Sequence, residues 1–335
     1  MTFSASEKSQ VRRRLLRWYD QNARDLPWRR SRDPYAIWVS EIMLQQTRVA
    51  AVLEHYHAFL KRFPTVKKLA AAREASVLAA WSGLGYYRRA RMLHSAAKVI
   101  VRERGGKFPT TAEEWQTLPG IGRYTAAAIA SIAFGEPVAV VDGNVERVLG
   151  RLTGQRLSGE QLWQTAEDLL APRRPGDFNQ AMMELGATVC LPRGPLCLAC
   201  PLHAFCATRG ELAGAVKAAP QKKREVHYTL DLRDGEVFLV QRPPKASLMA
   251  GMWELPERAE KNGKGSPSFT LRHSITVTDY TVQVWREPAA SSAAGKWVAL
   301  DRLDKTALTG LARKITRKAD LLWTTPTTEA RSHGG

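Results

Sequence analysis

All four cysteines of this 335-residue chain lie within one stretch of seventeen residues. They are Cys190, Cys197, Cys200 and Cys206, in the spacing C-x6-C-x2-C-x5-C. Four thiolates this close together can hold a zinc ion or an iron–sulfur cluster. Their crowding predicts one inorganic centre and argues against four unligated thiols or two disulfides.

The spacing favours the cluster over zinc. Structural zinc sites usually combine two short Cys-x2-4-Cys pairs, whereas here only Cys197 and Cys200 form such a pair. We therefore expect one [4Fe-4S] cluster, held by a tight loop at the end of a helix. The basic, proline-containing loop before Cys197 is expected to present Arg193 to a phosphate, so the cluster shapes a binding loop rather than catalysing electron transfer.

The formal net charge of +18 predicts an acidic partner, and nucleic acid is the first candidate because neutralising phosphates releases counterions. The basic residues are spread over the whole chain, so charge does not locate the site. No apolar run approaches the roughly 20 residues that span a bilayer, and residues 1–10 contain no apolar signal segment. We expect a cytoplasmic protein with reduced thiols and no membrane partner.

Two fold classes follow one another along the chain. Residues 7–206 have helical periodicity, as in Val11, Leu15, Trp18 and Asn22 on one side of a first helix. Residues 207–224 are small, polar and basic, which is typical of a linker.

Beyond residue 224 the pattern becomes strand-like. Val226–Arg233, Glu236–Arg242 and Ile275–Trp285 alternate or are β-branched, with a hairpin turn at Asp234-Gly235. We predict a mainly α domain over 7–206, a linker over 207–224, a smaller α+β domain over 225–323, and a flexible tail over 324–335.

The segment Leu118-Pro-Gly-Ile-Gly precedes a helix that should begin near Arg123. Gly120 and Gly122 let the backbone turn and approach a ligand closely. The free N–H groups at the start of the helix favour phosphate. Such a hairpin is often only a turn, but together with the cysteine cluster it indicates a phosphate-binding hairpin between two helices.

Two carboxylates are candidates for acid–base chemistry. Asp142 follows an apolar run and precedes a helix, so it is either an N-cap, a catalytic anion, or both. Glu41 has largely apolar neighbours, and its pKa should rise towards neutrality if it faces inwards. From spacing alone, a solvated glutamate on an amphipathic helix is the simpler interpretation of Glu41.

These motifs resemble those of the MutY-type adenine DNA glycosylases, in the iron–sulfur branch of the helix-hairpin-helix DNA glycosylase superfamily. The resemblance covers about residues 10–300 and is densest over 24–206. It implies that Glu41 protonates N7 of adenine and that Asp142 stabilises the sugar cation. It also implies that Tyr124 and Asn144 support the developing charge and hydrogen-bond the aspartate.

Position 124 separates this group from its relatives. In endonuclease III the matching residue is a lysine that forms a Schiff base with the sugar. Tyr124 cannot form an imine, so the resemblance implies base removal by water without an efficient lyase step.

Further residues match positions that handle the flipped base. A base must leave the stack before it can react, and aromatic stacking worth about 1–3 kcal/mol per base is comparable to that cost. By resemblance, Gln46 and Tyr86 match the wedge positions that fill the stack. Trp28, Arg29 and Gln180 match the adenine pocket.

The segment Leu248–Pro256 looks like part of the Nudix-like domain that ends MutY proteins. The R-E-x-x-E-E pattern of working Nudix hydrolases is missing after Pro256, so nucleotide hydrolysis is not expected. The domain is expected to bind the opposite base, 8-oxoguanine, with Thr276 as the hydroxyl donor. Many family members have Phe-Ser-His where this chain has Ile275-Thr-Val277, which leaves the strength of that preference open.

The resemblance implies a monofunctional, monomeric glycosylase that removes adenine opposite 8-oxoguanine or guanine in double-stranded DNA. Two alternatives stay open from the residues alone. One is a glycosylase for pyrimidine mismatches or oxidised bases. The other is an iron–sulfur DNA-binding or redox-sensing module without catalysis.

Overall fold

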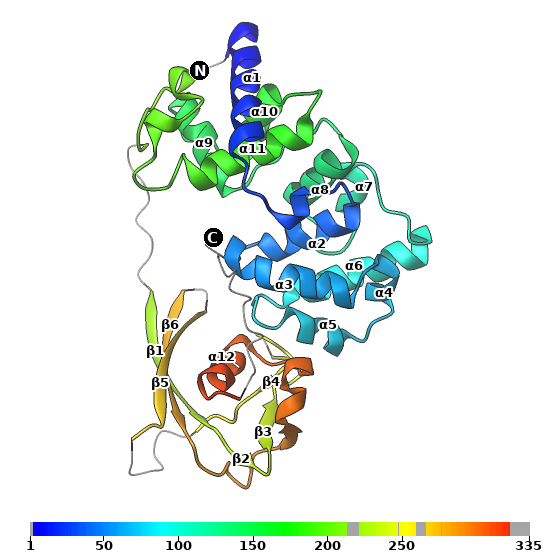
Figure 1. Cartoon of the computed structure of the whole chain (residues 1–335), viewed down its shortest axis with the longest axis vertical. Coiled ribbons are helices and arrows are strands. Elements are labelled where there is room, and N and C mark those ends of the chain that lie inside the picture. The colour runs from blue at the N-terminus through cyan, green and yellow to red at the C-terminus, as the bar shows by residue number, and fades with distance from the viewer. Residues whose placement is uncertain (1–2, 213–220, 247, 259–265, 276, 322–335) are drawn as a thin grey trace, which may run out of the picture. The chain divides into compact units, whose positions relative to one another are not determined.

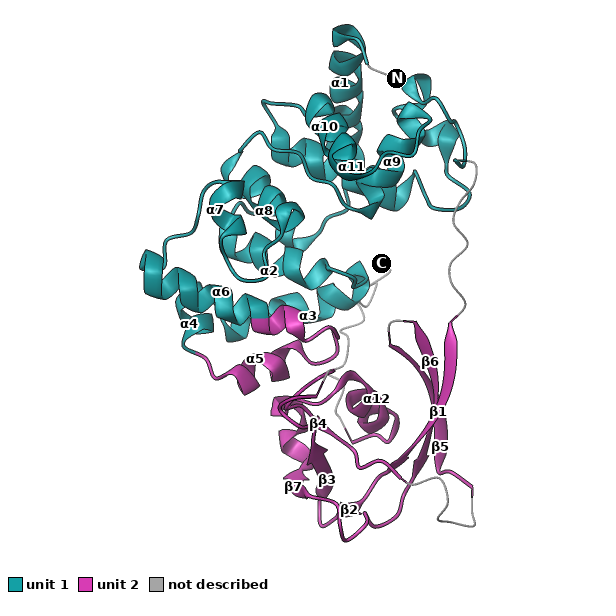
Figure 2. Ribbon diagram, turned by 180° about the vertical axis from the view of Figure 1, so that it is seen from behind, with its two compact units in different colours: residues 1–71, 92–217 teal, residues 72–91, 218–335 magenta. Residues whose placement is uncertain are grey.

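The computed structural model describes residues 3–212, 221–246, 248–258, 266–275 and 277–321. The chain divides into two compact units, residues 1–71 with 92–217 and residues 72–91 with 218–335 (Figure 2). The sequence pattern assigns residues 72–91 to the helical domain, whereas the structure groups them with the C-terminal residues. Among the described helices, none has the length and apolarity needed to cross a bilayer.

Every described secondary-structure element of the first unit is a helix or a helical turn, as the periodicity predicts (Figure 1). Its elements are α1 (Ala5–Asn22), η1 (Pro27–Arg29), α2 (Pro34–Leu44), α3 (Val49–Arg62), α4 (Val66–Ala70), most of α6 (Arg88–Arg104), α7 (Ala112–Gln116), α8 (Arg123–Ile129), a π-helical turn η2 (Ala130–Phe134), α9 (Gly143–Thr153), α10 (Gly159–Leu169), α11 (Pro175–Thr188), η3 (Cys197–Ala199) and η4 (His203–Phe205).

Helix α1 packs against α11 and α10, and the four helices α1, α9, α10 and α11 share one core (Figure 1). The buried face of α1 is Val11, Leu15 and Tyr19, at the i, i+4 spacing of one helix stripe. Trp18 is only partly buried and Asn22 is exposed, so the buried stripe lies further round the helix than the sequence predicts. Tyr19 therefore faces the interior beside α11.

The predicted hairpin lies between α7 and α8. Gly120 has φ +75°, and a Cβ built on it would lie 2.4 Å from Cβ of Met92. Gly122 is the N-cap of α8, and its carbonyl accepts the first bond of the helix from the amide of Ala126. The hairpin thus needs glycine at position 120 both for its backbone conformation and for space.

The second unit contains two sheets and α5 (Glu74–Trp81), with η5 (Leu300–Lys305) and α12 (Gly310–Lys318). One sheet has the order β1-β6-β5, with β1 parallel to β6 and β5 antiparallel to it. The other has the order β2-β3-β4, and β7 also pairs with β3. Their bounds are β1 Lys222–Thr229, β2 Leu232–Arg233, β3 Glu236–Gln241, β4 Trp253–Glu254, β5 Phe269–Ile275, β6 Thr278–Trp285 and β7 Gly295–Ala299.

Helix α12 lies between the two sheets in both views (Figures 1 and 2). Its Ile315 shares a core with Leu239 of β3 and Val282 of β6. The C-terminal part is therefore a smaller α+β unit with its own core, as predicted.

Two predicted strands are each divided in the structure. Val226–Arg233 contributes to β1 and to β2, which belong to different sheets, because the chain crosses over at Leu230 and Asp231. The carboxylate of buried Asp231 accepts from the amide of Ala289 at 2.8 Å, which fixes that crossing. Ile275 ends β5, and β6 begins at Thr278.

The predicted turn at Asp234-Gly235 is confirmed, since both residues have positive φ (47° and 77°) and connect β2 to β3. Strand β1 begins at Lys222, inside the predicted linker. Thr276 and the predicted tail 324–335 lie outside the described residues.

Replacing Gly120 by alanine should destabilise the first unit through overpacking against Met92, by about 1–3 kcal/mol beyond the backbone effect. Gly135→Ala is the matched control, because Gly135 has the same φ of +75° but no atom within 4 Å of its added Cβ. Denaturant midpoints of the two variants measure the difference. Equal midpoints would mean that Met92 moves aside without cost.

Candidate active site

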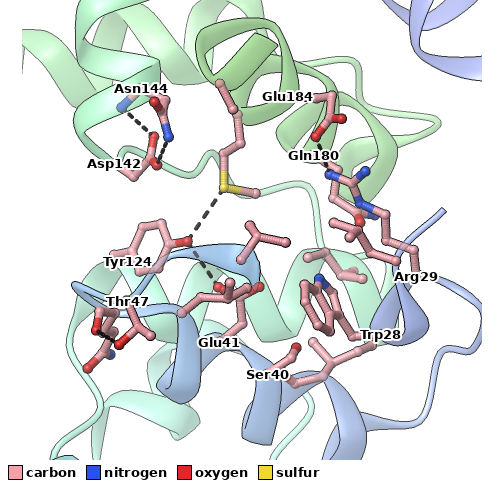
Figure 3. Close-up of a pocket in the computed structure, with 18 of the residues that line it drawn as sticks. Trp28, Arg29, Ser40, Glu41, Thr47, Tyr124, Asp142, Asn144, Gln180 and Glu184 are labelled. Carbon is pink, nitrogen blue, oxygen red and sulfur yellow. Dashed lines mark hydrogen bonds and ion pairs between the residues drawn. The ribbon is translucent and has the colours of Figure 1, made fainter. Parts of the chain in front are cut away.

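A cavity of about 410 Å³ opens in the first unit, between η1, α2, α8, the start of α9, and α11 (Figure 3). This volume falls within the range of small-ligand pockets, roughly 300–1,000 Å³. Eight of the residues singled out from the sequence line it together. They are Trp28, Arg29, Glu41, Gln46, Tyr124, Asp142, Asn144 and Gln180.

Glu41 points into this cavity from α2, a helix in which every residue from Tyr35 to Met43 is buried. Only 5% of Glu41 is exposed. Burial raises its pKa from 4.5 to about 7, and the nearby carboxylate of Asp142 adds to the rise. A hydrogen bond from Tyr124 and the charge of Arg29 oppose it. Because Glu41 faces inwards, its pKa lies near neutrality, as the sequence predicts for an inward-facing side chain.

Tyr124 is the second residue of α8. Its hydroxyl donates to Oε2 of Glu41 at 3.0 Å and lies 3.5 Å from Sδ of Met183 (Figure 3). Burial raises its pKa well above 10, so the phenol stays protonated. The resemblance implies a bond to the aspartate, whereas here the tyrosine bonds the glutamate and thereby orients its carboxyl.

Asp142 is the N-cap of α9, as one interpretation of its position predicted. Its Oδ1 accepts from the amides of Asn144 (2.9 Å) and Val145 (2.8 Å), and its Oδ2 accepts from Nδ2 of Asn144 (2.9 Å). Arg147 donates to Oδ1 of Asn144 at 2.8 Å and so fixes the orientation of that amide. Three N–H donors therefore hold the Asp142 carboxyl in place at the start of α9.

A buried ion pair that the sequence did not reveal forms another wall. Glu184 has no exposed surface and accepts from Arg24 through Nε (2.6 Å) and from Arg29 through Nη2 (2.7 Å). Burial by itself raises the pKa of Glu184, but these two arginines outweigh it and hold the pKa at about 2. The guanidinium of Arg29 also lies 5.4 Å from the ring centre of Tyr19.

Glu184 had a weak signal in the sequence. It follows Gln180 by four residues on α11, so both side chains lie on one helix face and both line the cavity. Its pairing with Arg24 could not be anticipated, because 160 positions separate them.

The remaining predicted residues have varied surroundings. Trp28 is 6% exposed and packs edge-on against Tyr56 at 5.3 Å, while Gln46 is exposed. Tyr86 belongs to the second unit, is 46% exposed, has φ +48°, and lies 5.5 Å from the guanidinium of Arg89.

The four cysteines line one small cavity at the end of the first unit's helices, together with Arg151 and Arg209. Arg151 donates to Sγ of Cys190 at 3.3 Å, and the amide of Arg209 donates to Sγ of Cys206 at 3.4 Å. N–H donors aimed at sulfur suit thiolates.

Among the described residues, no three His, Cys, Asp or Glu side chains converge closely enough to hold a metal ion. Four sulfurs around a common cavity, two of them with N–H donors, form a donor set of the kind that holds a [4Fe-4S] cluster.

Comparison with known proteins places this chain in a family. Residues 39–172 match the model of the HhH-GPD superfamily of base excision DNA repair proteins. The chain is 41% identical to the adenine DNA glycosylase of Homo sapiens over 316 residues, covering 75% of this chain and 58% of that protein. It is 33% identical to the adenine DNA glycosylase of Schizosaccharomyces pombe, covering 76% of this chain and 70% of that protein.

A solved structure of a thermostable thymine-DNA glycosylase also aligns, with a TM-score of 0.58 and 31% identity. The alignment covers 62% of this chain and 99% of that one. The chain spans between about half and three fifths of the length of the human, rat and mouse relatives.

Glu41→Gln should change how stability depends on pH. Below pH 4.5 the carboxyl is protonated in both the folded and the unfolded chain, so it contributes no pH dependence. Between pH 4.5 and about 7 the unfolded chain loses this proton first, so the wild type loses stability as pH rises. At pH 8 the glutamine variant should be the more stable, by at most about 3 kcal/mol.

Denaturant unfolding of both proteins from pH 4 to pH 8 measures this difference. Glu54→Gln, at an exposed position on α3, is the matched control and should show no such trend. A constant difference between Glu41→Gln and wild type across that range would contradict burial as its cause.

Proposed function

The chain belongs to the adenine DNA glycosylase family of the HhH-GPD superfamily, and from that premise we propose that it removes adenine from duplex DNA by hydrolysing the N-glycosidic bond. The observation that carries the proposal is the pair of carboxyl groups on one cavity. Glu41 has a pKa of about 7 and is buried, whereas Asp142 is held by three N–H donors. Their environments assign them opposite roles.

Glu41 acts as the acid. With a pKa of about 7 it holds a proton in a large fraction of molecules at neutral pH and can give it to N7 of the departing adenine. Tyr124 keeps the carboxyl oriented through its 3.0 Å bond. Asp142 stabilises the oxocarbenium-like sugar, as one carboxylate does in glycosidases.

The reaction is proposed to be monofunctional. Tyr124 occupies the position where a lysine would attack the sugar, and a phenol cannot form an imine. Water is then the nucleophile, and the product is an intact strand with an abasic site.

The pocket is proposed to read adenine through Trp28, Arg29 and Gln180, which line it. Gln46 and Tyr86 are proposed to fill the space that the extruded base leaves. Both are exposed, and both have positive φ, a conformation in which residues other than glycine are uncommon. Gly120 and Gly122 are proposed to bring backbone amides to a DNA phosphate.

The second unit is proposed to be a Nudix-like domain that binds the base opposite adenine, 8-oxoguanine or guanine, with Thr276 as its hydroxyl group. The four cysteines Cys190, Cys197, Cys200 and Cys206 would hold one [4Fe-4S] cluster. When bound, the cluster would fix the loop that carries Arg193, and its chemistry would be structural. We further propose a cytoplasmic monomer whose partner is DNA containing A:8-oxoguanine or A:G pairs.

The likeness to a thymine-DNA glycosylase supports a second candidate, removal of a mispaired pyrimidine. Its alignment extends over 62% of this chain. The position of the neutral Glu41 favours adenine, because a purine presents N7 as a basic atom for protonation and a thymine has none.

Three 30-base-pair duplexes test these candidates, one with an A:8-oxoguanine pair, one with A:G and one with G:T. Each is incubated with the protein and then treated with alkali, which breaks the strand at abasic sites. Scission at adenine in the first two is the expected result. Scission only at thymine supports the second candidate. No scission in any duplex supports the remaining alternative, an iron–sulfur DNA-binding module without catalysis.

Asp142→Asn should lower the single-turnover excision rate by about 10²–10³-fold while the duplex still binds. Asparagine caps helices as well as aspartate does, so α9 keeps its N-cap but loses the negative charge. Filter binding and excision under the same conditions measure both properties. Loss of binding as well would mean that Asp142 has mainly a structural role.

Tyr124→Lys should introduce a borohydride-trappable covalent adduct with mismatch DNA, because an amine at this position would face the sugar. Tyr124→Phe is the control and should give no adduct. Gel electrophoresis of the reduced mixture detects it. If no adduct forms with a variant that still binds DNA, the side chain at position 124 lies away from the sugar.

A further inference from the structure

The turn that connects α2 to α3 has an unusual residue at its third position. The amide of Thr47 donates to the carbonyl of Leu44 at 3.1 Å. Gln45 has φ −55° and ψ 114°, and Gln46 has φ +55°. These angles define a type II turn, in which the third residue is usually glycine. Here a glutamine is held in the left-handed region, so something must compensate for the strain.

A buried hydroxyl on another helix provides that compensation. Nε2 of Gln45 donates to Oγ1 of Thr125 at 3.0 Å. Thr125 is only 2% exposed and belongs to α8, whereas Gln46 is exposed. Gln45 and Gln46 both line the cavity. The residue before the strained position is therefore tied to α8, beside the pocket residue Tyr124, by a bond that water does not easily replace.

Helix α8 thus serves two groups from adjacent positions. Tyr124 donates to the acid Glu41, and Thr125 accepts from Gln45. Successive helix residues point about 100° apart, so the two bonds run to different parts of the pocket. The bond from Tyr124 orients the acid Glu41, and the bond to Thr125 holds the turn that contains Gln45.

We propose that Thr125 is a positioning residue that holds the Leu44–Thr47 turn, and with it Gln46, in the conformation needed to keep an extruded base out of the stack. This inference rests on the proposed function, since it requires a base to enter the cavity. The free energy of a left-handed glutamine is comparable to that of one hydrogen bond. Losing the bond to Thr125 is therefore enough to let the turn relax.

Thr125→Val tests the proposal, because valine keeps the shape and removes the hydroxyl. With an A:8-oxoguanine duplex, we expect the single-turnover excision rate to fall about tenfold, which corresponds to about 1.4 kcal/mol. Thr125→Ser keeps a hydroxyl and should restore most of the rate. Thr153→Val is the matched control, since Thr153 is also buried and its hydroxyl bonds only within α9.

Extrusion is measured separately from chemistry with 2-aminopurine next to the target adenine. In the Asp142→Asn background, saturating protein should raise its fluorescence, and adding Thr125→Val should remove more than half of that rise. The apparent pKa of excision in Thr125→Val should match wild type, because the Glu41–Tyr124 bond is intact. Gln45→Met should reproduce the loss, and the double variant should lose no more than either single one.

The outcomes distinguish this inference from the proposed function. A wild type that does not excise adenine defeats the proposed function itself. An active wild type with full fluorescence in Thr125→Val overturns the positioning role of Thr125. A shifted pH profile with normal extrusion also overturns it, because Thr125 would then act through Tyr124. If Thr125→Val fails to fold, Gln45→Met alone decides.

Discussion

Keeping the carboxyl of Glu41 out of water is the constraint on which the pocket depends. Burial removes water from the carboxyl group and disfavours its charged form, which raises the pKa of Glu41 to about 7. That condition requires α2 to be buried along nearly its whole length, and it is. The phenol of Tyr124 donates to Glu41 and by itself lowers the pKa of that carboxyl, but burial outweighs this bond.

Two other carboxyl groups line the same cavity, and both accept hydrogen bonds from N–H donors. Asp142 lies at the start of α9, where backbone amides donate to its carboxyl. Glu184 is as fully buried as Glu41, yet two arginines hold its pKa at about 2. The pKa values of Glu41 and Glu184 thus differ because burial dominates at Glu41, whereas two guanidinium groups bond Glu184 directly.

Several elements could be predicted from the sequence. The helices around Val11 and Leu15, the hairpin before α8 and the turn at Asp234-Gly235 all follow from local periodicity and turn chemistry. The N-cap role of Asp142 is equally local, because the donors lie two and three residues away. The same local rules failed where the chain changes partners. Val226–Arg233 reads as one strand, but its two halves join different sheets, and alternation does not reveal which sheet a strand joins.

Which side chains meet was beyond local rules. Tyr124 meets Glu41 across 83 positions, Gln45 meets Thr125 across 80, and Arg24 meets Glu184 across 160. The sequence by itself determined which residues could carry the chemistry: two acids, a tyrosine in place of a lysine, and four crowded cysteines. Only the tertiary structure decided the raised pKa of Glu41, because a pKa depends on solvent and neighbouring charge in space, and the packing of α2, α8, α9 and α11 creates both.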